Sequence, residues 1–163
     1  LIHKNRKREI HRSYTALVIG VVHTSGTIDE PLARHPKHRT KFAVHPNGRH
    51  AITHYSVLER FKHHTLLKVT LETGRTHQIR VHLHYANHPL IGDNMYKKYI
   101  TPKKNELSDE ALNAIYKFKR QALHATTLKF IQPITLEPIE LTLPLPKDFS
   151  ALLDAIDLND QHG

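Results

Sequence analysis

The strongest constraint on the fold comes from two neighbouring segments in which apolar and polar residues alternate. Ala51–Phe61 and Thr65–Glu72 both show this period of two, and only the polar tripeptide KHH separates them. Successive side chains of a β-strand point to opposite faces, so such alternation is typical of a half-buried strand. The short polar connection favours antiparallel pairing. We therefore predict an antiparallel β-hairpin from residue 51 to residue 72.

Other segments of the chain are typical of further strands and of helices packed on them. The segments rich in β-branched and aromatic residues are predicted strands: Arg12–Val22, Leu123–Ile131 and Pro138–Leu143. The segments with helical spacing of apolar residues are predicted helices: Thr76–Ala86, Ser108–Lys119 and Asp148–Leu158. Ser108 can cap the second helix, and a TGRT turn offers a cap for the first. Strands dominate without a regular βαβ alternation, which predicts an α+β fold with a mixed, mostly antiparallel sheet.

The distribution of charge points to a polyanionic partner. The chain carries 24 Lys and Arg residues against 15 acidic residues, and residues 1–54 hold ten of these cations with three acids. Such a field attracts nucleic acid, although a basic surface that only keeps a protein soluble explains the same excess. Three prolines and a PNG turn predict that Glu30–Arg49 is an exposed arm or hairpin. Its candidate RNA contacts are Arg34, Lys37, Arg39 and Lys41.

Composition excludes several other classes of protein. The chain has no cysteine, which removes thiol catalysis, disulfides and thiolate metal sites. The longest apolar stretch, Ala16–Val22, is too short to span a bilayer, so a soluble cytoplasmic protein with no membrane partner is expected. Sixteen histidines include a group from His77 to His88. We predict no metal site there, because His77 and His84 lie two helical turns apart and His82 points elsewhere.

The stretch LETGRTHQIRVHLHYANHPLIGDNMY, residues 71–96, concentrates groups that can bind an anion. Gly74 lets the backbone turn tightly. Arg75 and Arg80 can present forked donors to a carboxylate or phosphate near the start of the predicted helix. The alternative is that these are surface and capping residues, and the residues by themselves leave both interpretations open.

Four stretches of the chain together resemble a known enzyme family. They are EIHRSYTALVIG, GTIDEPLARHPKHRTKFAVHPNGRHAITHYSVLERF, LETGRTHQIRVHLHYANHPLIGDNMY and RQALHATTLKFIQPITLEPIELTLPLP. Their order and spacing resemble the RluA-type pseudouridine synthases, and within these the RluD-like subgroup acting on large-subunit ribosomal RNA. The resemblance covers nearly the whole chain. It implies a pseudouridine synthase fold, isomerisation of specific uridines in 23S ribosomal RNA without a cofactor, and ribosomal RNA as the partner. A monomer is expected separately from the resemblance.

The resemblance also implies roles for individual residues. Arg12 and Tyr14 match an RxY element whose tyrosine lies against the target base, so Tyr14 is the predicted stacking residue of the active site. Arg80 matches the arginine that pairs with the catalytic aspartate, a pairing that would keep the carboxylate ionised and oriented. Supporting or RNA-contact roles fall to four residues, which are Arg12, Arg75, His77 and Gln78.

The chain departs from the family pattern in one respect. The family's catalytic aspartate lies in an HRLD-like motif upstream of the RxY tyrosine, and these 163 residues contain no such motif. Asp93, in HPLIGD, matches a family bend and is assigned a structural role. We expect the chain to be the C-terminal part of a catalytic domain, without the N-terminal aspartate segment or any S4-type domain, and to be inactive alone. The alternative is a non-catalytic RNA-binding module on a synthase scaffold.

Overall fold

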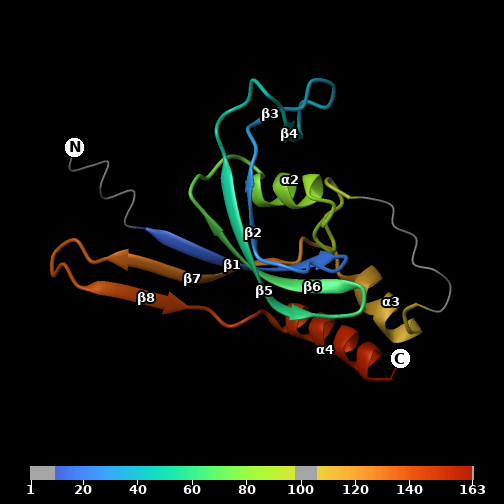
Figure 1. The fold of residues 1–163 in the computed structure, drawn as a ribbon. Coiled ribbons are helices and arrows are strands. Elements are labelled where there is room, and N and C mark those ends of the chain that lie inside the picture. Colours follow the sequence, from blue (N-terminus) through green and yellow to red (C-terminus); the bar gives the residue numbers. More distant parts are fainter. Residues whose placement is uncertain (1–9, 98–105, 163) are drawn as a thin grey trace.

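The computed structural model describes residues 10–97 and 106–162, which form an antiparallel sheet with helices on both faces (Figure 1). In spatial order the six strands of this sheet are β2 (Gly26–Asp29), β5 (Ile52–Arg60), β6 (His64–Leu71), β1 (His11–Ile19), β7 (Leu123–Ile131) and β8 (Pro138–Thr142). The helices in the described part of the chain are α2 (Gln78–Tyr85), α3 (Asp109–Lys117) and α4 (Lys147–His162). The predicted α+β class is confirmed. Within the same residues, none of the helices is both long and apolar enough to cross a membrane.

The hairpin predicted from alternation is present as β5 and β6. The two strands pair antiparallel, with Val57 opposite Leu67, and each ends within one residue of its predicted bounds. His64, expected in the polar connection, is instead the first residue of β6, because the amide of Phe61 donates to its carbonyl at 2.9 Å and closes a tight turn.

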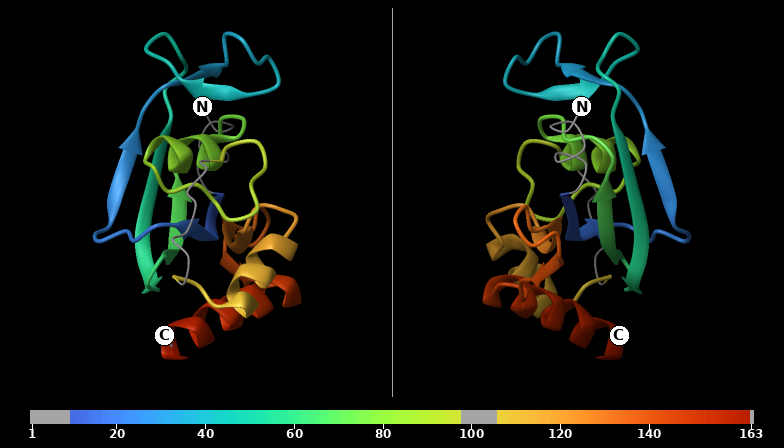
Figure 2. Two further views of the ribbon diagram at one scale, coloured as in Figure 1. Left: turned by 90° about the vertical axis from the view of Figure 1, so that its right-hand side faces the viewer. Right: turned by 90° about the vertical axis from the view of Figure 1, so that its left-hand side faces the viewer.

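The two faces of the sheet are covered by different helices, as the side views in Figure 2 show. Ala16 of β1 packs with Ile79 and Leu83 of α2 in one apolar cluster. Leu17, the next residue, packs in a second cluster with Phe149 of α4, on the opposite face. The alternation of a single strand therefore supplies apolar side chains to two separate layers.

The segment that follows α2 is held between β1 and the residues before β7. The amide of Ile91 donates to the carbonyl of Leu17 at 3.0 Å, and the amide of Ala122 donates to the carbonyl of Ile91 at 2.8 Å. Gly92 comes next with φ of 79°, a conformation that glycine adopts without strain. A Cβ at this position would collide with the carbonyl oxygen of Arg120, so glycine is required for both reasons.

α2 begins without the side-chain cap that the TGRT turn predicted. Its N-cap residue, His77, is left-handed with φ of 56° and makes no side-chain cap hydrogen bond. The hydroxyl of Thr73 instead accepts from the amide of Ile52 at 3.0 Å and donates to Oε1 of Gln78 at 2.7 Å. The threonine thus joins β5 to α2. The cap predicted for α3 is confirmed, because Ser108 accepts a hydrogen bond from a first-turn amide at 3.1 Å.

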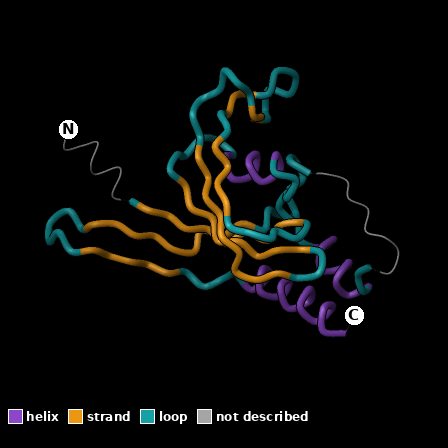
Figure 3. The backbone as a smooth tube through the Cα atoms, viewed as in Figure 1, coloured by secondary structure: helices purple, strands orange, loops and turns teal. Residues whose placement is uncertain are grey.

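The predicted basic arm forms a small hairpin of its own. Its strands are β3 (Leu32–Arg34) and β4 (Phe42–Val44), and they stand apart from the main sheet beyond α2 (Figures 1 and 3). Leu32, 3% exposed, packs with Val81 of α2 and anchors the base of the hairpin. The arm is therefore fixed at its base and free to present its outer residues to solvent.

Candidate functional site

A buried ion pair joins α2 to the loop after it. Arg80 donates from Nε and Nη2 to the two carboxylate oxygens of Asp93, each at 2.9 Å. The side chain of Arg80 is 16% exposed and that of Asp93 only 1%. The same carboxylate accepts the backbone N–H groups of Met95 at 3.0 Å and Tyr96 at 3.1 Å. These four hydrogen bonds satisfy a charge that would otherwise be costly to bury.

The surroundings of the pair keep both partners ionised. Burial alone raises the pKa of Asp93, but the hydrogen bonds from Arg80, Tyr96 and Met95 outweigh burial and leave that pKa below its usual range. The hydrogen bond to Asp93 raises the pKa of Arg80 in turn. No hydrogen bond within residues 10–97 and 106–162 uses Nη1 of Arg80. The guanidinium is thus a rigid cation with one edge left for a further acceptor.

Tyr96 connects this ion pair to the arm. Its ring lies under the guanidinium of Arg80, 5.0 Å from centroid to Cζ, and its hydroxyl accepts from the amide of Phe42 at 2.8 Å. The same hydroxyl lies 2.7 Å from Nδ1 of His77. Burial raises the pKa of Tyr96, while burial and then Arg80 lower the pKa of His77. The imidazole of His77 is therefore neutral, and its hydrogen bond with the Tyr96 hydroxyl orients the ring.

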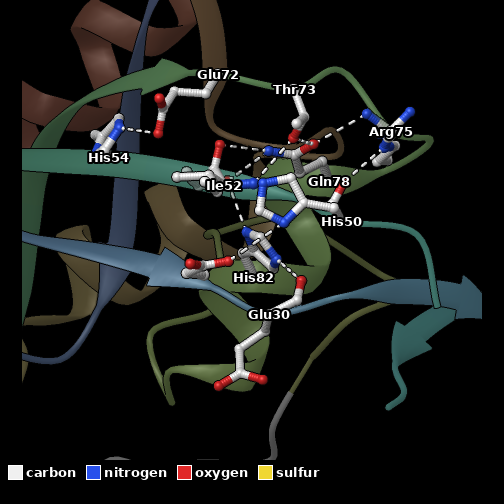
Figure 4. Close-up of polar contacts among 11 residues, drawn as sticks. Glu30, His50, Ile52, His54, Glu72, Thr73, Arg75, Gln78 and His82 are labelled. Atoms are coloured by element: carbon white, nitrogen blue, oxygen red, sulfur yellow. Dashed lines mark hydrogen bonds and ion pairs between the residues drawn. The ribbon is translucent and has the colours of Figure 1, made fainter. Parts of the chain in front are cut away.

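A buried polar network centred on Gln78 lies at the start of α2 (Figure 4). Gln78 is 2% exposed, and its amide nitrogen donates to the carbonyl of Ile52 and the hydroxyl of Thr53, both at 2.9 Å. Its amide oxygen accepts from the hydroxyl of Thr73 at 2.7 Å and from the amide of Arg75 at 3.0 Å. Both donors and both acceptor positions are used internally, so the geometry of Gln78 is that of a supporting residue. Its contact with RNA stays a prediction.

The network continues to the base of the arm through His82. The hydroxyl of Thr53 lies 2.7 Å from Nδ1 of His82, whose Nε2 lies 2.8 Å from the carbonyl of Glu30 (Figure 4). Burial lowers the pKa of His82, so its ring is neutral, donating from Nε2 and accepting at Nδ1. Arg75, which is half-buried, donates from Nε to the carbonyl of His50 at 2.8 Å. The polar residues of the motif thus hold the arm, β5 and α2 together.

Tyr14 lies on β1, on the sheet face covered by α2. It is paired with Val69 of β6 and Ala125 of β7, and it packs against the apolar cluster that contains Ile79. Arg12, two residues earlier on the same strand, is exposed. Tyr14 and α2 are therefore on one side of the sheet, and the catalytic role of Tyr14 and the RNA contact of Arg12 stay predictions.

The four candidate cations of the arm lie on its outer part. Lys37 and Arg39 are exposed and Lys41 is partly so. The guanidinium of Arg34 lies over the ring of Phe42 at 5.2 Å and donates to the carbonyl of Arg39 at 2.5 Å. None of the four forms an ion pair with a carboxylate in the described part of the chain. Their charges are thus available to an external anion.

Two members of this cluster are absent from the predicted site residues: Asp93, whose expected structural role agrees with its hydrogen bonds here, and Tyr96. The signal that could have found the first is Arg80 itself, since a mostly buried guanidinium needs acceptors for its donors and a carboxylate makes the strongest of these hydrogen bonds. No comparable local signal marks Tyr96, whose partners come from distant parts of the sequence. The residues that the structure describes contain no group of three or more His, Asp or Glu side chains placed to hold a metal ion.

Comparison with solved structures defines the class of protein. Human RNA Pseudouridylate Synthase Domain Containing 4 matches 96% of this chain and 66% of its own with a TM-score of 0.72 and 26% identity. Human RNA Pseudouridylate Synthase Domain Containing 1 matches 89% of this chain and 58% of its own with a TM-score of 0.70 and 23% identity. The fold is that of the pseudouridine synthases.

Sequence comparison narrows this class to a family. The model of the RNA pseudouridylate synthase family matches residues 1–85, more than half of the chain, so the chain belongs to this family. Ribosomal large subunit pseudouridine synthase D of Pasteurella multocida is 47% identical over 161 residues, which is 99% of this chain and 49% of that protein. The protein of the same name from Escherichia coli K12 is 46% identical over 156 residues, 96% of this chain and 48% of that protein. The expected relationship is confirmed, and the chain spans about half the length of the curated relatives it matches.

Proposed function

We propose that this chain is the carboxy-terminal part of the catalytic domain of an RNA pseudouridine synthase that isomerises specific uridines of 23S ribosomal RNA. The observation that carries the proposal is the 47% identity over 161 residues with a ribosomal large subunit pseudouridine synthase. The net charge of +9 and the unpaired cations of the arm support an RNA substrate.

The reaction rearranges bonds within one nucleotide. The bond between uracil N1 and ribose C1′ breaks, a bond between C5 and C1′ forms, C5 loses its proton and N1 gains one, so the product is an isomer. An ionised carboxylate attacks or stabilises the separated groups. Arg80 is the proposed partner of that carboxylate, because Asp93 already holds the guanidinium in place and leaves Nη1 for a second acceptor. The catalytic carboxylate is assigned to a segment outside this chain, since no acid here lies in an HRLD-like motif.

The other predicted residues would hold the RNA during this step. Tyr14 is proposed to stack on the uracil after it leaves the helix, and stacking on an aromatic side chain contributes about 1–3 kcal/mol per base. Phosphates flanking the target are assigned to the exposed cations of the arm. Target choice would then depend on RNA shape and on unpaired loop bases.

Tritium release from stem-loop RNA containing [5-³H]uridine tests the proposal, because the C5 hydrogen leaves when C5 bonds to ribose. The full-length protein is expected to release tritium, whereas residues 1–163 alone are expected to bind the RNA without release. Release by residues 1–163 alone would overturn the assignment of the carboxylate to another segment. Salt-dependent RNA binding without release by the full-length protein would favour the non-catalytic RNA-binding module.

A further inference from the structure

A hollow of about 490 Å³ lies between the arm and α2. Three segments line it: the hairpin of β3 and β4, the last turns of α2, and the loop after Asp93. Val81 and Met95 supply apolar wall, Tyr85 supplies an aromatic ring, and Lys41 supplies a cation. We propose that this hollow binds one unpaired nucleotide of the RNA, with the base on Tyr85 and the phosphate at Lys41. The inference rests on the proposed function, in that RNA is the substrate.

The charge of the lining selects an anionic ligand. None of the described residues around the hollow is acidic, whereas lysines and histidines come from both the arm and the helix side. A cation beside an apolar wall and an exposed ring is the combination that single-stranded nucleic acid requires, since the phosphate needs the charge and the base needs a surface on which to stack. An apolar ligand without a phosphate would leave Lys41 unused.

Accessibility distinguishes Tyr85 from the other two aromatic residues of the lining. The ring of Phe42 is covered by the guanidinium of Arg34 at 5.2 Å, and the ring of Tyr96 by that of Arg80 at 5.0 Å. Tyr96 is also only 5% exposed, whereas Tyr85 is 51% exposed. A base can therefore reach Tyr85, while the other two rings serve as walls.

The size and rigidity of the hollow suit one nucleotide. Its volume falls at the lower end of the range of about 300–1,000 Å³ that is typical of small-molecule pockets. The hydrogen bond from the amide of Phe42 to the hydroxyl of Tyr96, 2.8 Å long, ties the arm wall to the loop wall and holds them at a fixed separation. A base-paired nucleotide is too bulky for such a site, so the site favours loops over duplexes.

This site is distinct from the one predicted for the target uridine. Tyr14 lies on β1 in the layer between the sheet and α2, and it is not among the residues that line the hollow. The nucleotide held at Tyr85 is therefore a neighbour of the isomerised uridine, and its capture would position the loop relative to the active site.

The test compares Tyr85→Ala, Tyr85→Phe and Tyr116→Ala in the full-length protein. Tyr116, on α3, is 77% exposed and serves as the matched control on the other side of the sheet. The probes are a stem-loop RNA with 2-aminopurine in its loop and a blunt duplex of the same length. We expect Tyr85→Ala to weaken stem-loop binding by about 5- to 100-fold and to reduce the quenching of 2-aminopurine, while duplex binding is unchanged. Tyr85→Phe and Tyr116→Ala should bind both probes as the wild type does.

Tritium release by the same preparations separates this inference from the proposed function. Wild-type release together with unchanged stem-loop affinity in Tyr85→Ala would overturn the nucleotide site alone. Equal loss of stem-loop and duplex affinity in Tyr85→Ala would also overturn it, since the contribution of the ring to binding would then not depend on an unpaired base. A wild-type protein that neither binds the stem-loop nor releases tritium would overturn both.

Discussion

Two arginine–aspartate pairs on opposite sides of the sheet have the same geometry and different surroundings. Arg80 with Asp93, and Arg120 with Asp148, each form two hydrogen bonds of 2.9 Å, and each guanidinium lies over an aromatic ring at 5.0 and 5.2 Å, respectively. The side chains of the first pair are 16% and 1% exposed, and those of the second 43% and 52%. Water screens an exposed pair and competes for its donors, so only the buried pair makes a rigid cation. Bidentate geometry alone does not hold an arginine rigidly; burial of its carboxylate does.

The largest difference between the pairs should appear in turnover. In the full-length protein, Arg80→Ala is expected to lower tritium release by at least about 100-fold, because the charge proposed to face the reacting carboxylate is lost. RNA affinity should stay within a few-fold, and Arg120→Ala should leave both quantities unchanged. Wild-type turnover in Arg80→Ala would remove this arginine from the mechanism.

A second difference concerns stability. Asp93→Ala leaves the guanidinium of Arg80 without its partner in a buried position and should lower the free energy of unfolding by about 3–5 kcal/mol. Asp148→Ala is expected to unfold in urea as the wild type does. Similar urea midpoints for the two variants would show that burial does not distinguish these pairs.

Buried histidines extend the comparison to pH. His82, on the α2 side, is hydrogen-bonded at both nitrogens, whereas Nδ1 of His64, on β6, is buried without a hydrogen-bond partner in the described residues. Burial, with a smaller effect of His63, lowers the pKa of His64 to about 4. As the pH falls below about 6.5, His64 becomes protonated in the unfolded chain, whereas in the folded chain it stays neutral down to about pH 4. The free energy of unfolding therefore decreases between pH 6.5 and pH 4, by up to about 3 kcal/mol.

Replacement of His64 tests this pH dependence. In the variant His64→Leu, the free energy of unfolding should depend less on pH between pH 6.5 and 4 than in the wild type. Urea denaturation at several pH values measures this dependence. His23→Leu, at an exposed position, should keep the wild-type slope. An unchanged slope in His64→Leu would place the acid sensitivity elsewhere.

The smallest expected effect is on the salt dependence of RNA binding. It compares the cations of the arm with lysines on the α3–α4 side of the sheet and on β7. Alanine at all four arm positions, Arg34, Lys37, Arg39 and Lys41, should reduce the dependence of log affinity on log salt concentration by up to about 3, because each phosphate contact contributes about 0.7 with single-stranded RNA. A control variant carries alanine at four exposed lysines of the α3–α4 side and of β7, namely Lys117, Lys119, Lys129 and Lys147. Equal slopes in the two variants would exclude the arm from the RNA interface.

Local sequence patterns predicted most of the helices and strands. The features that they did not predict depend on contacts between residues far apart in the sequence. The alternation that predicted β5 and β6 reflects which face of each strand is buried. The order of neighbouring residues alone shows which face this is. The start of α2 was mispredicted because Thr73 bonds to Ile52 and Gln78 and is not available as a cap. Nothing near Tyr96 in the sequence indicates that its hydroxyl meets Phe42, a residue of the distant arm. The sequence therefore indicated Arg80 and the polar residues at the start of α2, but it did not indicate that Asp93 and Tyr96 join them or which hydrogen bonds connect the cluster.

The glycine that follows Ile91 limits how this site can be transplanted. Gly92 precedes the carboxylate of the buried pair and leaves room only for the carbonyl oxygen of Arg120, the residue whose side chain forms the exposed pair. Residues 77–96 grafted onto another scaffold would therefore lack the backbone of Arg120, Ala122 and Leu17 against which their loop is packed and hydrogen-bonded. The smallest portable unit includes residues 118–122 and the strand residues around Leu17 to which the loop is hydrogen-bonded. Circular permutants and split versions of the protein should accordingly keep these three segments together.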